Sequence, residues 1–293
     1  MRCGEDNNMT RLPTFVGIGG HKCASTWLSE CMRDHPQIFV SEPKELAFFS
    51  NRYDKGLEWY SAFFKSSSKY RQAGEYTSHY IYHEKAPQRI LETIGQVRVL
   101  AVIREPVARA LSQIKYGIRH GFLDRPSARV ISLPQLLQFI DAYSPIIDRS
   151  LYVAGIRRFM SAMGTQNVLV LDQYDCSRSP DLVLQRVWDF LDVDTNVVSN
   201  TALRRVSIGI TPQFMILEKI RERLFYFVNA RSPRLITLSR KFRIGEFYRR
   251  MNAGRDVELS SEAHDYLANQ FAEDWALARE YCWRPDQSSQ DCE

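Results

Sequence analysis

The residues best suited to chemistry stand in a short loop near the start of the chain. The loop reads Gly17-Ile18-Gly19-Gly20-His21-Lys22-Cys23-Ala24-Ser25-Thr26-Trp27. Its glycines allow a tight turn, and the amides at the start of a following helix can bind an anion. Because Lys22 adds positive charge and the hydroxyls of Ser25 and Thr26 add donors, we predict a phosphate-binding loop. The alternative is an ordinary helix start with Ser25 as its N-cap.

This loop differs from the phosphate loop of nucleoside triphosphatases. That loop requires Gly-Lys-Ser/Thr, whose hydroxyl binds magnesium, whereas Lys22 here follows His21 and precedes Cys23. The sequence therefore argues against a triphosphatase. A kinase-like enzyme with a variant phosphate loop stays open as an alternative.

A second candidate anion site follows the apolar run 97–103, which reads Val-Arg-Val-Leu-Ala-Val-Ile. Arg104 comes directly after this predicted strand, and Ser112 lies two turns along the predicted helix. A guanidinium binds two phosphate oxygens at once, which favours a phosphate ligand for Arg104. The alternative is a structural pair of Arg104 with Glu105 or another carboxylate. We expect Arg109 to be a solvated helix residue.

The apolar pattern predicts the elements that position these loops. Buried strands are expected at 14–19, 97–103 and 167–171, and helices at 25–33, 106–116, 150–163, 180–191 and 260–281. Residues 41–82 are more irregular and include a short 74–77 segment. Strands that alternate with helices predict a three-layer α/β fold with a central parallel sheet flanked by helices. Both candidate loops then lie at carboxyl ends of strands, where such folds bind ligands.

The composition suits one globular domain. The chain has 293 residues, 44% of them apolar and 25% charged, so we predict a single domain over 1–293. Residues 1–12 are expected to be a flexible N-terminus and 205–258 a variable basic helical segment.

Residues 219–255 carry a net charge of +9, against +5 for the whole chain. We favour solvated basic helix faces for this segment. The alternative is contact with an acidic polysaccharide or a membrane surface; no nucleic-acid motif is present.

Other classes of site lack a sequence signal. The six cysteines are scattered without zinc-ligand spacing, and no metal site is predicted. No apolar run reaches the roughly 18–20 residues that cross a bilayer, and the first residues lack the apolar core of a signal peptide. We therefore expect a cytoplasmic protein with free thiols.

Taken together, the motifs resemble the PAPS-dependent sulfotransferases, where PAPS is 3′-phosphoadenosine-5′-phosphosulfate. The resemblance is to the branch shared by heparan-sulfate sulfotransferases and bacterial enzymes, which has a P-loop-like sheet. Five elements match in order over about 120 residues: Lys22–Thr26, His35-Pro36, Lys44–Phe49, Gly56–Tyr60 and Arg104–Ser112. Ala24 and Ser25 replace the family's glycine and threonine, and Ala24 could crowd the backbone near the donor.

The resemblance implies a role for each matched residue. Lys22, Cys23, Ala24, Ser25, Thr26 and Trp27 would bind the 5′-phosphosulfate, and Arg104 and Ser112 the 3′-phosphate, with PAP as product and no metal. Lys22 would stabilise the leaving oxygen and Glu45 would be the catalytic base. We expect Phe48 and Phe49 to raise the pKa of Glu45. The alternatives are a structural ion pair of Glu45 with Lys44, and His79 or His83 as the base.

The acceptor is less defined than the donor. The resemblance implies sulfuryl transfer to a hydroxyl or amine of a carbohydrate, lipid-linked or small-molecule acceptor. Tyr76 stands where heparan-sulfate enzymes carry a lysine, which predicts an acceptor less acidic than heparan sulfate. A non-catalytic protein that binds PAP or a membrane is the further alternative.

Overall fold

The computed structural model describes residues 12–202 and 256–285, and these form two compact units. The first unit contains residues 12–106, 151–202 and 271–285, and the second contains 107–150 and 256–270. The predicted N-terminal tail and nearly all of the predicted basic segment lie outside the described residues. The prediction of a single domain over 1–293 stays a prediction.

The first unit is built on a parallel sheet, as predicted, and the described residues supply six strands to it. The strand order is β2-β3-β1-β4-β6-β8, and every pair is parallel. The strands are β1 (Phe15–Gly19), β2 (Ile38–Val40), β3 (Gln72–Tyr76), β4 (Arg98–Ile103), β6 (Val168–Asp172) and β8 (Cys282–Trp283). Because β1 lies between β3 and β4, the loops that follow these three strands lie at the same edge of the sheet.

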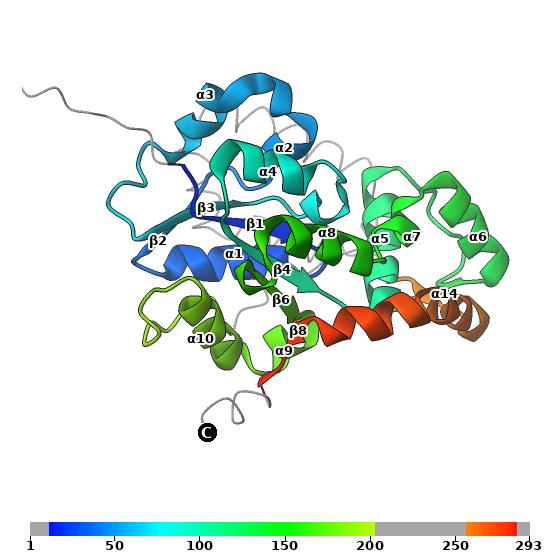
Figure 1. The fold of residues 1–293 in the computed structure, drawn as a ribbon. Coiled ribbons are helices and arrows are strands. Elements are labelled where there is room, and N and C mark those ends of the chain that lie inside the picture. Colours follow the sequence, from blue (N-terminus) through cyan, green and yellow to red (C-terminus); the bar gives the residue numbers. More distant parts are fainter. Residues whose placement is uncertain (1–11, 203–255, 286–293) are drawn as a thin grey trace, which may run out of the picture. The chain divides into compact units, whose positions relative to one another are not determined.

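Helices cover both faces of this sheet (Figure 1). On one face lie α1 (Ser25–Asp34), α9 (Gln173–Arg178) and α10 (Pro180–Phe190); on the other lie α2 (Phe48–Asn51), α3 (Gly56–Ser61), α4 (Ala86–Ile94) and α8 (Val153–Met163). Single turns of 3₁₀ helix occur at η1 (Tyr53–Lys55), η2 (Ala62–Phe64), η3 (Tyr80–Tyr82) and η4 (Thr165–Asn167). The three-layer α/β class predicted from the alternating pattern is therefore confirmed.

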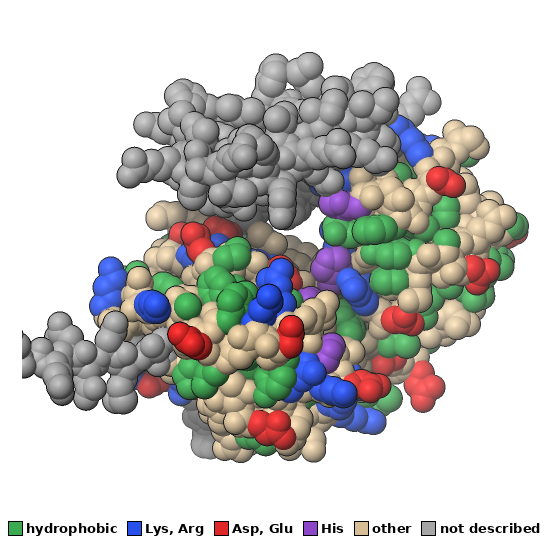
Figure 2. All heavy atoms as spheres, turned by 90° about the horizontal axis from the view of Figure 1, so that it is seen from above, with side chains coloured by type: hydrophobic (Ala, Val, Ile, Leu, Met, Phe, Trp, Pro, Cys, Tyr) green, Lys and Arg blue, Asp and Glu red, His purple; other side chains and the backbone are tan. Residues whose placement is uncertain are grey.

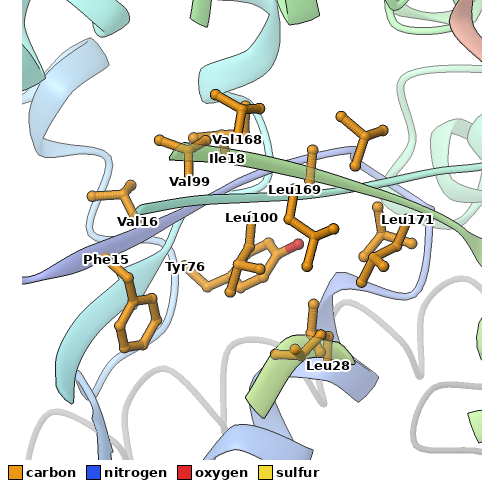
Figure 3. Packing of buried hydrophobic residues seen from close by; sticks show 14 of the residues in the cluster. Phe15, Val16, Ile18, Leu28, Tyr76, Val99, Leu100, Val168, Leu169 and Leu171 are labelled. Atoms are coloured by element: carbon orange, nitrogen blue, oxygen red, sulfur yellow. The ribbon is translucent and has the colours of Figure 1, made fainter. Parts of the chain in front are cut away.

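The central strands are apolar because both of their faces are covered. Val16 and Val99 project to one side of the sheet, while Leu100 and Leu169 project to the other, toward Leu28 on α1 (Figure 3). All five side chains are buried. This core holds the carboxyl ends of β1 and β4 in place, which carry the two predicted anion loops.

The strand β3 lies in the region that we expected to be irregular. All five of its residues are buried, including Gln72 and Glu75. Its Tyr76 ring packs so closely on β1 that a Cβ at Gly17 would lie 2.2 Å from it. The sequence of β3, Gln-Ala-Gly-Glu-Tyr, contains no apolar run that would predict a buried strand. Its place in the sheet depends also on polar side chains and on close packing against glycine.

The second unit contains most of α5 (Pro106–His120), together with β5 (Val130–Ile131), α6 (Leu133–Ala142), α7 (Pro145–Asp148), β7 (Glu258–Leu259) and the first half of α14 (Ser261–Glu280). Arg109 on α5 is fully buried, so the prediction of a solvated residue is wrong. Its guanidinium donates to Ser150 Oγ and to the carbonyl oxygens of Pro145 and Ile146, each at 2.8 Å. These acceptors compensate the burial of its charge.

The surface of the described residues carries both signs of charge. Basic and acidic side chains are interspersed on the face shown in Figure 2. Cys23, Cys31, Cys176 and Cys282 are buried free thiols. Among the described helices, none is both long and apolar enough to cross a membrane.

Candidate active site

The loop between β1 and α1 has the strained backbone of a tight turn. Lys22 and Ala24 have φ angles of 70° and 67°, in the left-handed region. Ala24 is the N-cap of α1 and makes no side-chain cap bond, so the alternative with Ser25 as N-cap is wrong. The first intrahelical bond runs from Leu28 N to Ala24 O at 3.2 Å. The amides of residues 25–27 therefore precede the helical ladder, as an anion site requires.

Ala24→Gly is expected to raise the free energy of unfolding by about 0.5–1 kcal/mol. An alanine in the left-handed region costs roughly 1–2 kcal/mol, and the greater freedom of glycine in the unfolded chain offsets part of the gain. Chemical denaturation measures the difference. Ala162→Gly, in the helix α8, is the matched control and should destabilise by about 1 kcal/mol. Equal destabilisation by both substitutions would contradict the prediction.

Lys44 brings a second cation to this loop. Its Nζ donates to Ser25 Oγ at 3.1 Å and contacts Thr26 Oγ1 at 3.5 Å. The same Nζ donates to Glu45 Oε1 at 3.1 Å and lies 5.3 Å from the centre of the Tyr76 ring. Lys44 thus connects the hydroxyls of the anion loop with the predicted base.

Glu45 is held at the carboxyl end of β3 by its backbone and by its side chain. Its amide donates to Tyr76 O at 3.0 Å, and its Oε2 accepts from Ser78 N at 2.9 Å. His79 Nδ1 lies 3.7 Å from Oε2, and His79 Nε2 lies 2.7 Å from Ser50 Oγ. Both nitrogens of His79 therefore have neighbours within the protein, and the alternative of His79 as the base stays a prediction.

The electrostatic environment of Glu45 differs from the prediction. Partial burial acts to raise its pKa, but His79, Lys44 and the Ser78 amide outweigh burial and lower the pKa from 4.5 to about 2. The expected increase from Phe48 and Phe49 is therefore wrong. The carboxylate is ionised at neutral pH, which is the form that can accept a proton.

Arg104 joins the second predicted loop to the first. Its Nη1 donates to Lys22 O at 3.4 Å, and its own carbonyl accepts from Tyr152 Oη at 2.9 Å. Tyr152 Oη also contacts Cys23 Sγ at 3.6 Å. The buried Tyr152 thereby links the loops that follow β1 and β4. The predicted pairing of the two anion loops at neighbouring strands is found in the structure.

The other predicted site residues have different surroundings. Cys23 is buried, and the buried Trp27 donates from Nε1 to Ala202 O at 3.1 Å, so both contribute to packing. Ser112 lies on α5 in the second unit, and its role stays a prediction. The pKa of His83 is lowered by burial and by Arg89.

Two contacts of the site escaped sequence reasoning. The sequence indicates Lys44 as an ion-pair partner of Glu45, and it indicates no role for Tyr152. The position of Lys44 beside Glu45 in the Lys-Glu motif was the available signal for the first. No local signal pointed to the second. Within the described ranges, no cluster of three or more His, Cys, Asp or Glu side chains could hold a metal ion.

Residues 45–49, called the Glu45 segment below, lie near Glu75, a fully buried carboxyl group on β3. Burial raises its pKa from 4.5 to about 7, although hydrogen bonds from Thr77, Tyr80 and Tyr60 oppose the increase. The folded protein therefore holds this proton over a pH range in which the unfolded chain releases it.

This shift predicts a pH-dependent stability. The contribution of Glu75 to the free energy of unfolding should be greatest below pH 4.5. It should fall by about 3–3.5 kcal/mol as the pH rises through 7, since the pKa is raised from 4.5 to about 7 and each pKa unit corresponds to ~1.4 kcal/mol. Glu75→Gln should remove this contribution. Urea denaturation of both proteins between pH 5 and 8 measures the difference, and parallel curves would contradict it.

The part of the chain that carries these residues matches a known protein family. The chain matches the family model described as the sulfotransferase domain over residues 14–211. This match covers more than half of the sequence and includes both anion loops, Lys44 and Glu45. The chain therefore belongs to the sulfotransferase domain family, and the resemblance stated from its motifs is confirmed.

The individual proteins that the chain resembles share a third or less of the aligned residues with it. The membrane-associated sulfotransferase kil1 of Dictyostelium discoideum is 33% identical over 111 residues, covering 37% of this chain and 24% of that protein. The bifunctional heparan sulfate N-deacetylase/N-sulfotransferase 4 of Mus musculus is 26% identical over 208 residues, covering 66% and 24%. Each match thus spans about a quarter of the relative. A sulfotransferase structure from Alicyclobacillus acidocaldarius shares the fold, with a TM-score of 0.58 and 24% identity over 78% of this chain and 96% of that one.

Proposed function

We propose that this protein transfers a sulfuryl group from PAPS to a hydroxyl or amine of an acceptor. The observation that carries the proposal is the position of Lys44, whose ammonium lies 3.1 Å from both Ser25 Oγ in the anion loop and Glu45 Oε1. An anion-binding loop and an ionised base thus meet at one cation. Transfer from an anionic donor to a neutral nucleophile is accelerated by a base for the acceptor's proton and by positive charge beside the donor.

The donor would be held at its two ends by the two loops. Lys22, Lys44, the hydroxyls of Ser25 and Thr26 and the first amides of α1 suit the 5′-phosphosulfate, because they supply charge and several donors. Arg104 suits the 3′-phosphate, with Ser112 as a predicted partner. The bond of 3.4 Å between Arg104 and Lys22 O supports the use of both loops by one nucleotide.

In the reaction, the acceptor oxygen or nitrogen would attack sulfur as its proton passes to Glu45. The bond between sulfur and the bridging oxygen of the 5′-phosphate breaks, and PAP leaves. Negative charge develops on that oxygen, where Lys22 and Lys44 would stabilise it. His79 and the Ser78 amide would keep the Glu45 carboxylate oriented.

For the acceptor we propose a carbohydrate hydroxyl or amine. The relative from Mus musculus is named for N-sulfation of heparan sulfate, which supports a sugar acceptor. Tyr76 is fully buried, and its hydroxyl donates to Gly19 O at 2.9 Å. Position 76 therefore offers no cation to an acidic sugar, which supports an acceptor less acidic than heparan sulfate.

Calorimetry tests the donor. PAP should bind at least about tenfold more tightly than AMP, because each charged hydrogen bond to the 3′-phosphate contributes about 1.5–3 kcal/mol. Arg104→Gln should remove this preference. Arg186→Gln on α10, which pairs with Asp189, is the matched control and should retain it. Equal affinities for PAP and AMP in the wild type would refute the proposal.

Radiolabelled PAPS tests the transfer. The protein is incubated with neutral and acidic oligosaccharides, glycolipids and small metabolites, and label is followed into each acceptor. Transfer to a neutral or weakly acidic sugar is expected. PAP binding without transfer to any acceptor would favour a non-catalytic binding protein, and magnesium-dependent ATP turnover would favour the kinase-like alternative.

A further inference from the structure

The Glu75 carboxyl group has no part in the mechanism proposed above, yet it accepts three side-chain hydrogen bonds. Its Oε1 accepts from Tyr80 Oη at 2.8 Å and from Tyr60 Oη at 3.2 Å. Its Oε2 accepts from Thr77 Oγ1 at 2.6 Å. Three hydroxyls from β3 and its neighbours thus converge on one buried carboxyl group, and such a network is conformationally demanding.

Two of these hydroxyls also hold the backbone of the Glu45 segment. Thr77 Oγ1 accepts from Ala47 N at 3.1 Å, and Tyr80 Oη accepts from Phe49 N at 3.1 Å. Each hydroxyl accepts one bond and donates one. Two chains of hydrogen bonds, called relays below, therefore end at Glu75. One runs from the Ala47 amide through Thr77 and the other from the Phe49 amide through Tyr80, and bonds in series strengthen one another. Tyr60 donates to Glu75 but makes no such bond to the segment.

The segment that these relays hold is strained. Glu45 and Ala47 have φ angles of 64° and 54°, and a non-glycine residue with such an angle needs the surrounding structure to maintain it. The relays end at residues 47 and 49, two and four positions after Glu45. Ser78 N, which donates to the Glu45 carboxylate, directly follows Thr77. One buried acid is thus connected to both sides of the proposed base.

We propose that ionised Glu75 is a positioning residue for sulfuryl transfer, because it holds residues 45–49 through Thr77 and Tyr80 and so fixes the direction of the Glu45 carboxylate. This inference rests on the function proposed above. Glu75 itself does not touch the reacting atoms.

The protonation state of Glu75 decides whether both relays are complete. The ionised carboxylate accepts from all three hydroxyls, whereas the protonated group must donate one bond and so competes with a relay. The titratable groups that face it are Tyr60 from α3, Tyr80 from η3 and, more distantly, Glu45. Its pKa of about 7 then predicts that kcat rises with pH through this value.

The first experiment measures transfer as a function of pH. Glu75→Gln should lower kcat by about 10- to 100-fold, since small misplacements of catalytic groups have effects of this size, and should abolish the inflection near pH 7. The Kd for PAP should change by less than about twofold. Tyr60→Phe should retain the plateau kcat and shift the inflection upward, because it removes one bond to the ionised form. Wild-type kcat and inflection in Glu75→Gln would overturn the proposal.

The second experiment does not depend on activity or on a soluble Glu75 variant. Hydrogen exchange at the amides of Ala47 and Phe49 should accelerate in Thr77→Val and Tyr80→Phe respectively, and Thr77→Ser should restore protection at Ala47 because it keeps the hydroxyl. Unchanged exchange would overturn the proposal even in the absence of turnover. A wild-type protein that transfers no sulfuryl group refutes the proposed function, whereas an active wild type with unchanged variants refutes only the positioning role.

Discussion

Glu45→Gln is expected to lower kcat for sulfuryl transfer by about 10²- to 10⁴-fold, the usual contribution of a general base. The amide cannot accept the acceptor's proton, but its oxygen can still accept the bond from Ser78 N. The loop contacts should therefore persist, and the Kd for PAP should change by less than about twofold. Steady-state transfer and calorimetry on the same preparation separate the two quantities.

Glu42→Gln is the matched control for this substitution. Glu42 lies three residues earlier, its side chain is 72% exposed, and its nearest cation, Arg33, is 3.9 Å away. It should keep wild-type kcat. If Glu45→Gln also kept it, Glu45 would not be the base, and His79→Asn would be the next variant to measure. Loss of activity in both glutamine variants would point to a general effect of charge.

Lys44→Met has the second-largest expected effect, because Lys44 contacts both the anion loop and the base. Loss of a preorganised charge at a developing anion typically costs about 10²- to 10³-fold in kcat. The Kd for PAP should also rise, by about tenfold, since the hydroxyls of Ser25 and Thr26 lose their cation. Lys55→Met, an exposed lysine, is the matched control.

The pH profile distinguishes the two roles of Lys44. In the wild type, Glu45 has a pKa of about 2 and stays ionised throughout the working range. Lys44 is one of the groups that lower this pKa, so its removal should move the pKa upward, toward 4.5. The acidic limb of kcat/KM should then shift to higher pH. A lower kcat without this shift would mean that Lys44 contacts the donor but does not control the base.

The family and the main strands could be predicted from the sequence because their signals are local. Apolar β-branched runs such as 97–103 form strands that are buried on both faces, wherever the rest of the chain lies. The loop around Lys22 and the position of Arg104 after β4 follow from neighbouring residues. Parallel pairing of β1 with β4 then brings both loops to one edge of the sheet.

Other features depend on residues distant in the sequence. The strand β3 carries a buried Glu75, and hydrogen bonds from the hydroxyls of Tyr60, Tyr80 and Thr77 compensate its burial. The helix pattern alone predicts that Arg109 lies on the surface. In the second unit its guanidinium is instead buried and donates to Ser150 and to two carbonyl groups. Its burial could not be inferred from the helix alone.

The candidate active site likewise has features that the sequence determines and features that only the fold determines. The residue types of the anion loops and the Lys44-Glu45 pair are properties of the sequence. The lowered pKa of Glu45, the contact of Lys44 with Ser25 and the connection of Arg104 to Lys22 O arise only in the folded chain. The physical reason is that a pKa depends on every charge and donor within a few ångströms, and these come from segments that sequence order does not bring together.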